Sequence, residues 1–119
     1  MKKIMIVDDD EKVTTMLKRF LSSKGYQITA INESSQAVQT ANEASPDLFI
    51  LDIMMPPPDG FTLCKMLRAD PKFSRTPILI ITAFEISNSK AATVGADGYL
   101  AKPFDLDELA SKLDELLRG

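Results

Sequence analysis

The sequence predicts an α/β fold, in which a single doubly wound sheet of five parallel strands carries helices on both faces. Short apolar runs alternate with longer segments whose apolar residues recur at helical spacing, and this alternation occurs five times. The apolar runs are nearly continuous, which is typical of strands buried on both faces. The 119 residues fit one domain, because single cores of roughly 100–150 residues are the commonest size.

The first two strand–helix units lie in the amino-terminal part of the chain. Ile4–Val7 is an apolar run short enough for a buried strand, and Tyr26–Ile31 is expected to form the second strand. The helix between them is marked by Val13, Met16, Leu17, Phe20 and Leu21. Gly25 suits the position just after that helix. Ser34 or Ser35 is the expected N-cap of the second helix.

Three further units complete the predicted sheet. Leu48–Leu51, Pro77–Ile81 and Tyr99–Ala101 are the expected third, fourth and fifth strands. The helix after the third strand carries an apolar face of Phe61, Cys64 and Leu67. A weakly patterned segment, Glu85–Val94, lies where the fourth helix is expected. The last helix begins near Asp105, and its apolar stripe consists of Leu106, Leu109, Leu113 and Leu116.

Composition excludes several classes of function. The net charge of −3 and the absence of a Lys/Arg cluster argue against direct contact with nucleic acid. No apolar run approaches the roughly 20 residues that span a bilayer, so no membrane segment is expected. The single Cys64 fits a reducing cytoplasm. The chain has no histidine, so any phosphohistidine in its mechanism must belong to a partner.

Polar residues follow four of the predicted strands. Asp8–Asp10 follow the first strand, Asp52 the third, Thr82 the fourth and Lys102 the fifth. Ligands of doubly wound sheets bind outside the carboxyl ends of the strands. In a sheet of order 2-1-3-4-5 the first and third strands are neighbours, so we expect their aspartates to converge on one pocket.

This set of side chains indicates phosphoryl chemistry. Crowded carboxylates repel one another and need a cation, and oxygen ligands suit Mg²⁺, with Mn²⁺ as an alternative. A carboxylate beside such an ion can act as a nucleophile toward phosphorus. Lys102 can pair with one phosphoryl oxygen, and the Thr82 hydroxyl can donate to another.

The motifs at the strand ends resemble, in order and across essentially the whole chain, those of response regulator receiver domains of two-component systems. They are Val7-Asp8-Asp9, Leu51-Asp52 with Pro56 and Asp59-Gly60 after it, Thr82-Ala83, and Gly95-Ala96-Asp97-x-Tyr99-x-x-Lys102-Pro103-Phe104. The resemblance implies a flavodoxin-like, CheY-like fold in which residues 1–119 form one receiver domain.

The resemblance also implies a role for each matching residue. By the resemblance, Asp52 stands at the position of the phosphoacceptor, which is also a metal ligand. Asp9 stands at the position of a direct Mg²⁺ ligand, and Asp8 at that of a ligand that acts mainly through water. The backbone carbonyl of Met54 is expected to complete the metal site. The expected phosphate-binding and switch residues are Thr82, Ala83, Lys102 and the rotating aromatic Tyr99.

The function that follows from the resemblance is a phosphorylation switch. A sensor histidine kinase or a histidine phosphotransfer protein is expected to phosphorylate Asp52, and the conformational change then alters the affinity for another partner. Such a domain promotes its own phosphorylation and dephosphorylation but is not a turnover enzyme. No organic cofactor is expected, and the chain is either a free-standing regulator or a piece of a longer regulator or hybrid kinase.

Two features depart from the family pattern. Pro57 stands where relatives usually have glycine, and with Pro58 it removes two N–H donors, so a stiffer loop is expected. Thr82 and Lys102 are closer in sequence than is typical of the family, and the missing residues fall around Phe84–Lys90. A shortened or mobile fourth helix is therefore expected.

Other functions remain open at this point. A pseudo-receiver that binds partners without phosphorylation would keep the same fold. A phosphatase of the haloacid dehalogenase type needs a second aspartate two positions after Asp52, where this chain has Met54. A flavodoxin-like FMN protein needs a phosphate-binding loop after the first strand, where Asp8–Asp10 would repel the phosphate.

Overall fold

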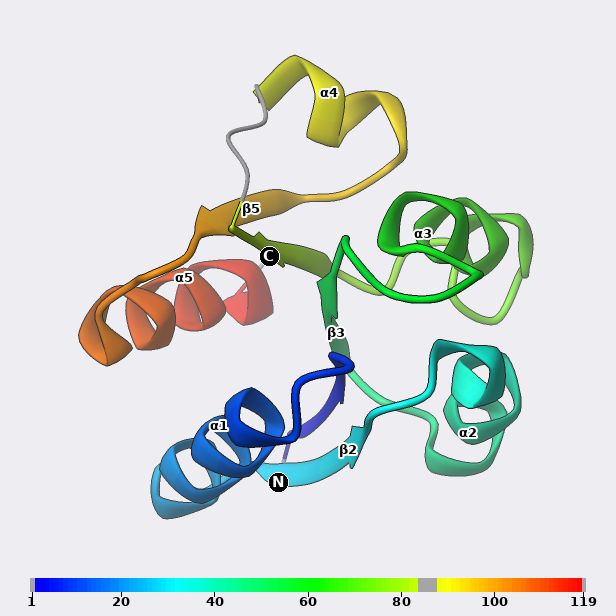
Figure 1. Ribbon diagram of the computed structural model, residues 1–119. Coiled ribbons are helices and arrows are strands. Elements are labelled where there is room, and N and C mark those ends of the chain that lie inside the picture. Colours follow the sequence, from blue (N-terminus) through cyan, green and yellow to red (C-terminus); the bar gives the residue numbers. More distant parts are fainter. Residues whose placement is uncertain (1, 84–87, 119) are drawn as a thin grey trace.

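The computed structural model describes residues 2–83 and 88–118, and within them one parallel sheet has the strand order β2-β1-β3-β4-β5 (Figure 1). The strands are β1 (Lys3–Val7), β2 (Gln27–Ile31), β3 (Leu48–Asp52), β4 (Ile78–Thr82) and β5 (Gly98–Ala101). The predicted doubly wound sheet and its strand order are therefore confirmed.

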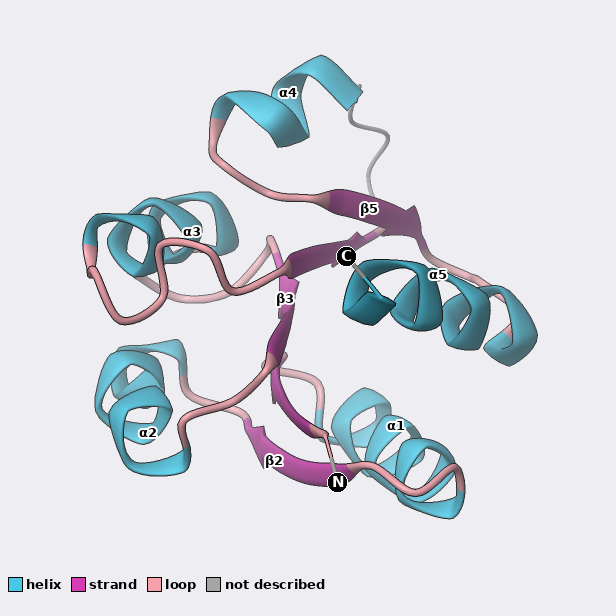
Figure 2. Cartoon of the chain, turned by 180° about the vertical axis from the view of Figure 1, so that it is seen from behind, coloured by secondary structure: helices cyan, strands magenta, loops and turns pink. Residues whose placement is uncertain are grey.

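Helices cover both faces of this sheet (Figure 2). They are α1 (Glu11–Ser23), α2 (Ala37–Ala44), α3 (Gly60–Ala69), α4 (Asn88–Thr93) and α5 (Leu106–Arg118). Helices α1 and α5 pack on one face, and α2 and α3 pack on the other. All five residues of β3 and of β4 are buried, as expected for central strands between two layers of helices.

Helix α1 connects the end of β1 to the edge strand β2. Its N-cap is Asp10, whose side chain accepts a hydrogen bond from the N–H of Lys12 at 2.9 Å. Three buried residues at helical spacing, Thr14, Leu17 and Leu21, hold the helix on the sheet. The helix is followed by Gly25 at a φ of 95°, a left-handed conformation that glycine adopts without strain.

The expected N-cap of the second helix is wrong. Ser34–Gln36 form a short 3₁₀ turn, and α2 begins only at Ala37. The hydroxyl of Ser34 donates to the carbonyl oxygen of Pro56 at 2.8 Å, and no side chain caps either helical segment. This serine is buried, so its hydroxyl needs a hydrogen-bond partner, and the carbonyl of Pro56 in the loop after β3 provides one.

Helix α4 has six residues, which confirms that the fourth helix is short. The mobility expected for Phe84–Val94 concerns in part residues 84–87, which lie outside the described residues. Ala91 in this helix and Val94 directly after it are buried. None of the helices in the described ranges combines the length and the apolar character needed to cross a lipid bilayer.

Candidate functional site

The strand register brings the predicted site residues to one edge of the sheet. Val7 pairs with Leu51 between β1 and β3, so Asp8 and Asp52 emerge side by side. Strand β4 ends at Thr82, which pairs with Ala101 of β5. The backbone N–H of Lys102 donates to the carbonyl of Thr82 at 2.7 Å, which extends this pairing by one residue.

Three carboxylates form the centre of the site. Asp8, Asp9 and Asp52 each offer a carboxylate oxygen, and these three oxygens lie within 4.8 Å of one another. Asp8 is fully buried and Asp52 is 5% exposed, whereas Asp9 is exposed. The turn after β1 is fixed locally, because the N–H of Asp10 donates to a carboxylate oxygen of Asp8 at 2.9 Å.

Lys102 supplies the positive charge closest to these carboxylates among the ion pairs of the described residues. Its Nζ lies 2.9 Å from Oδ2 of Asp8 and 3.6 Å from Oδ1 of Asp52. The peptide bond between Lys102 and Pro103 is cis. These two distances place the ammonium between the acidic turn after β1 and the end of β3.

The charges at the site shift the pKa of two groups. Burial, followed by repulsion from Asp8, raises the pKa of Asp52 to about 6, although Lys102 and the N–H of Ile53 oppose the shift. Burial alone would lower the pKa of Lys102, but its hydrogen bond to Asp8 and the charges of Asp8 and Asp52 raise it above the ordinary value. The site thus favours a bound positive charge.

The donor set fits a hard divalent cation. One ammonium cannot neutralise three carboxylates, and converging carboxylate oxygens are the ligands that such ions prefer. Exposure of Asp9 leaves room for the water ligands that a small, strongly hydrated ion retains. The expected role of the Met54 carbonyl stays a prediction; the residue is 58% exposed.

The remaining predicted site residues differ in how deeply they are buried and in what they contact. Thr82 is fully buried at the end of β4, and the adjacent Ala83 is exposed. Ala83 and Lys102 line a mainly apolar hollow, whose other residues are Val13, Met16, Pro103 and Phe104. Tyr99 is half-buried and packs against the core on the α3 face of the sheet. The switch roles expected for Thr82 and Tyr99 stay predictions.

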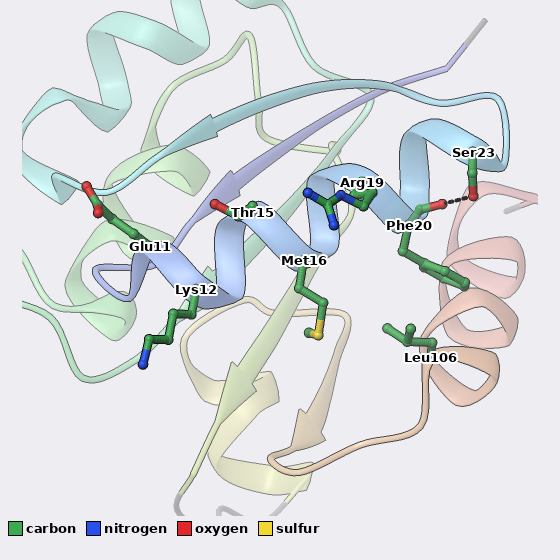
Figure 3. Close-up of a pocket in the computed structure, with 8 residues that line it drawn as sticks. All are labelled: Glu11, Lys12, Thr15, Met16, Arg19, Phe20, Ser23 and Leu106. Carbon is green, nitrogen blue, oxygen red and sulfur yellow. Dashed lines mark hydrogen bonds between the residues drawn. The ribbon is translucent and has the colours of Figure 1, made fainter.

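A second hollow runs along α1 and reaches Leu106 at the start of α5 (Figure 3). Its lining combines charged and apolar side chains, namely Glu11, Lys12, Thr15, Met16, Arg19, Phe20, Ser23 and Leu106. Met16 lines both this hollow and the one beside Lys102. The surface next to the site therefore continues onto α1.

Sequence reasoning did not identify three residues that support the site. Asn32 and Ser34 follow β2 and contact the loops that carry the acids. Asn32 could have been found, because it is the polar residue that follows β2. The rule on the carboxyl ends of strands was applied to the other four strands but not to this one. At Gly60 a Cβ atom would clash with the backbone of Asp52 and Ile53, which the matching Asp59-Gly60 motif alone did not reveal.

A parallel sheet with acids, a hydroxyl and an ammonium at its carboxyl edge defines the class of phosphoryl-accepting switch domains. Comparison with known proteins specifies the family. Residues 4–114 match the family model described as the response regulator receiver domain, so the chain belongs to that family. Receiver domains accept phosphoryl groups from histidine kinases and act as switches rather than as turnover enzymes.

The relatives share the fold but extend beyond it. The transcriptional regulatory protein GltR of Pseudomonas aeruginosa is 35% identical over 119 residues, which cover 98% of this chain and 49% of GltR. The chain spans about half the length of the curated relatives it matches.

Solved structures agree closely with the fold. The chemotaxis protein CheY4 of Vibrio cholerae has a TM-score of 0.91 and 33% identity, with 98% of each chain covered. The response regulator TrrA of Thermotoga maritima, solved in complex with Mg(2+)-BeF, has a TM-score of 0.87 and 33% identity, covering 98% of this chain and 99% of that one.

Proposed function

We propose that this receiver domain accepts a phosphoryl group on the carboxylate of Asp52, in a Mg²⁺-dependent reaction, from a histidine kinase or a histidine phosphotransfer protein. The observation that carries the proposal is the position of Asp52 at the end of β3. There its carboxylate lies in the acidic cluster and 3.6 Å from the ammonium of Lys102. The chain has no histidine, so the phosphohistidine belongs to the partner.

The chemistry needs a nucleophile and groups that neutralise charge. A carboxylate oxygen of Asp52 attacks phosphorus, the bond from phosphorus to the donor's imidazole nitrogen breaks, and an acyl phosphate forms on Asp52. Lys102, which pairs with Asp8 and Asp52 beforehand, pairs with a phosphoryl oxygen and neutralises its charge. The Thr82 hydroxyl donates to another phosphoryl oxygen, and Ala83 belongs to the same phosphate-binding part of the site.

The metal site consists of Asp8, Asp9, Asp52 and the backbone carbonyl of Met54. Asp9 and Asp52 would contribute ligands directly, and Asp8 would act mainly through a bound water. When bound there, Mg²⁺ would supply positive charge that neutralises part of the carboxylate and phosphoryl charge. Mn²⁺ shares this preference for oxygen ligands, so it is the expected substitute.

The same proposal covers the consequence of phosphorylation. Residues 1–119 act as one receiver domain in which Thr82 and Tyr99 reorient, and a distal surface changes its affinity for a downstream partner. The domain promotes its own phosphorylation and dephosphorylation and works in the cytoplasm. Its net charge of −3 supports a function without direct contact to nucleic acid.

Intact-protein mass spectrometry tests the proposal most directly. The protein is incubated with Mg²⁺ and acetyl phosphate, which is a small acyl-phosphate donor. We expect one phosphoryl group on the wild type, none on Asp52→Asn, and none on the wild type when EDTA replaces Mg²⁺. Asp10→Asn is the matched control, because asparagine caps a helix as well as aspartate does and the variant should be modified normally.

An unmodified wild-type protein that is folded and binds Mg²⁺ would contradict phosphorylation of Asp52. The phosphorylation-independent interaction module would then be the better description. Modification of Asp52→Asn at the wild-type rate would place the phosphoacceptor elsewhere.

A further inference from the structure

The segment that connects β2 to α2 contacts both loops of the acidic site. Asn32 and Ser34 lie in this segment, and neither carries a charge. Asn32 contacts the turn that carries Asp8 and Asp9, and Ser34 contacts the proline-rich loop after Asp52. The segment thus joins two parts of the site that are separated by more than forty positions in the sequence.

Asn32 contacts both the acidic turn and helix α1. Its side-chain amide donates to the backbone carbonyl of Asp8 at 2.8 Å and to Oγ1 of Thr14 at 2.9 Å. Thr14 is buried in the first turns of α1, and its hydroxyl donates to the carbonyl of Glu11 at 3.2 Å. The N–H of Asp8 also donates to the carbonyl of Ile31 at 3.2 Å, so both backbone polar groups of Asp8 are held from the β2 side.

Ser34 holds the loop that follows β3. It is 5% exposed, and its hydroxyl donates to the carbonyl of Pro56 at 2.8 Å. Residues 56–58 are all proline, so this part of the loop has no backbone N–H with which to fix itself. Its carbonyl oxygens are the only backbone groups there that can form hydrogen bonds, which makes the contact from Ser34 an effective anchor.

We propose that Asn32 and Ser34 are positioning residues that hold the Asp8–Asp9 turn and the Met54–Pro58 loop at a fixed separation and thereby set the affinity of the acidic site for a divalent cation. The inference rests on the proposed function in taking the acidic cluster as a cation site. Repulsion among the three carboxylates pushes the Asp8–Asp9 turn away from Asp52, and the hydrogen bond from Asn32 to the Asp8 carbonyl opposes this movement. The hydrogen bond from Ser34 fixes the loop whose Met54 carbonyl is the further expected ligand. Outer hydrogen bonds of this kind orient the ligands of a metal.

The variants Asn32→Ala and Ser34→Ala remove one contact each. Isothermal titration calorimetry with Mg²⁺ alone, without a phosphoryl donor, gives the dissociation constant. We expect each variant to bind Mg²⁺ about tenfold more weakly than the wild type, the lower end of the effect typical of outer-shell partners. Ser34→Thr keeps the hydroxyl and should recover most of the lost affinity.

Two matched controls lie outside this segment. Asn42 donates to a backbone carbonyl within α2, and Ser74 donates to the carbonyl of Pro71, so Asn42→Ala and Ser74→Ala each remove a side-chain contact to the backbone. Both controls should bind Mg²⁺ within twofold of the wild type. Circular dichroism and urea unfolding establish that each variant is folded; if Asn32→Ala does not fold, Ser34→Ala and Ser34→Thr decide.

The dependence of phosphorylation on Mg²⁺ gives a second readout. With acetyl phosphate as donor, the half-saturating Mg²⁺ concentration should rise about tenfold in Ser34→Ala, while the rate at saturating Mg²⁺ stays within about twofold. Folded variants that bind Mg²⁺ as the wild type does would overturn the positioning roles. A wild type that binds Mg²⁺ but is not phosphorylated contradicts only the proposed function, and one that binds no Mg²⁺ overturns both.

Discussion

The ammonium of Lys102 donates a hydrogen bond of 2.9 Å to a carboxylate oxygen of Asp8, a residue 94 positions earlier in the chain. The carboxylate of Asp8 is fully buried, and the side chain of Lys102 is 22% exposed. This pair connects the first strand of the fold to the last and occupies the space between the acidic turn and Asp52. The lysine therefore has a structural role before any phosphoryl group is present.

Replacement of this lysine separates its two roles. Lys102→Met leaves Asp8 buried without its ion-pair partner, so at pH 7 the metal-free protein should lose about 3 kcal/mol of unfolding free energy. Lys102→Arg keeps the charge and should lose less than half of that. Both variants should be phosphorylated more slowly by acetyl phosphate, because the position of the charge also matters in transfer. Urea unfolding in EDTA and mass spectrometry measure the two effects.

Lys112→Met serves as the control, because Lys112 lies on α5 and is absent from the ion pairs of the site. Lys112→Met should change neither the unfolding free energy nor the rate of phosphorylation by much. Equal losses of stability in Lys102→Met and Lys102→Arg would contradict a stabilising role of the charge.

Asp52 should make the stability of the metal-free protein depend on pH. Its folded-state pKa of about 6 lies above the ordinary value of 3.8, so the folded protein holds this proton more tightly than the unfolded chain does. The resulting stabilisation is complete below pH 3.8 and is lost as the pH rises through 6. Asp52→Asn should therefore match the wild type near pH 4 and exceed it by about 2–3 kcal/mol at pH 7.

Urea unfolding in EDTA across this pH range measures the difference. Asp59→Asn is a suitable control, because Asp59 is the N-cap of α3 and asparagine caps equally well. A difference between Asp52→Asn and the wild type that stays constant from pH 4 to pH 7 would contradict the raised pKa.

Gly60 allows α3 to start directly against the end of β3. A Cβ atom at this position would clash with the backbone carbonyl oxygen of Asp52 and lie 2.7 Å from Cα of Ile53. Backbone atoms cannot move aside cheaply, so Gly60→Ala should lose more than about 3 kcal/mol of unfolding free energy and weaken Mg²⁺ binding. Thermal unfolding and calorimetry measure these effects.

Gly25→Ala is the matched control for this substitution. Gly25 has a φ of 95° but nothing within 4 Å of an added Cβ, so alanine introduces backbone strain without a clash. It should lose only about 1–2 kcal/mol and leave Mg²⁺ binding unchanged. A smaller loss for Gly60→Ala than for Gly25→Ala would contradict the close approach of α3 to β3.

The fold and most of the site follow from the sequence because the signals are local. Buried strands show as continuous apolar runs, and residues such as Asp52 and Thr82 end those runs, so the rule for the carboxyl ends of parallel strands places them together. In a doubly wound sheet of order 2-1-3-4-5 the first and third strands are neighbours, which put Asp8 beside Asp52. The register of β1 with β3 confirms that placement.

The residues that sequence reasoning missed act across the fold. Ser34 is a residue type that often caps helices, but its buried hydroxyl donates instead to the carbonyl of Pro56, 22 positions away in the sequence. The need for glycine at position 60 depends on how closely α3 approaches β3, which no local pattern records. Long-range hydrogen bonds and close backbone contacts of this kind become visible only when the elements are assembled.

Arg68 provides such a long-range contact at a distance from the site. From α3, its guanidinium donates to the carbonyls of Phe73, Thr76 and Gly95 and to the carboxylate of Asp97, at 2.6–2.9 Å. Arg68→Met removes all four bonds and should lower the unfolding free energy by about 2–3 kcal/mol. Arg68→Lys should not restore it, because an ammonium cannot reproduce the planar fork of donors. Urea unfolding measures both variants.

Arg118→Met is the matched control for Arg68→Met. Arg118 pairs with Asp114 at 3.7 Å on the exposed side of α5, and exposed pairs of this type contribute about 0.5 kcal/mol or less. None of the bonds of Arg68 reaches the acidic cluster among the described residues, so Mg²⁺ binding by Arg68→Met should stay within twofold of the wild type. A tenfold loss of Mg²⁺ affinity in Arg68→Met would mean that general destabilisation weakens the cation site. Weaker Mg²⁺ binding by Asn32→Ala and Ser34→Ala would then not show that these two residues position the site.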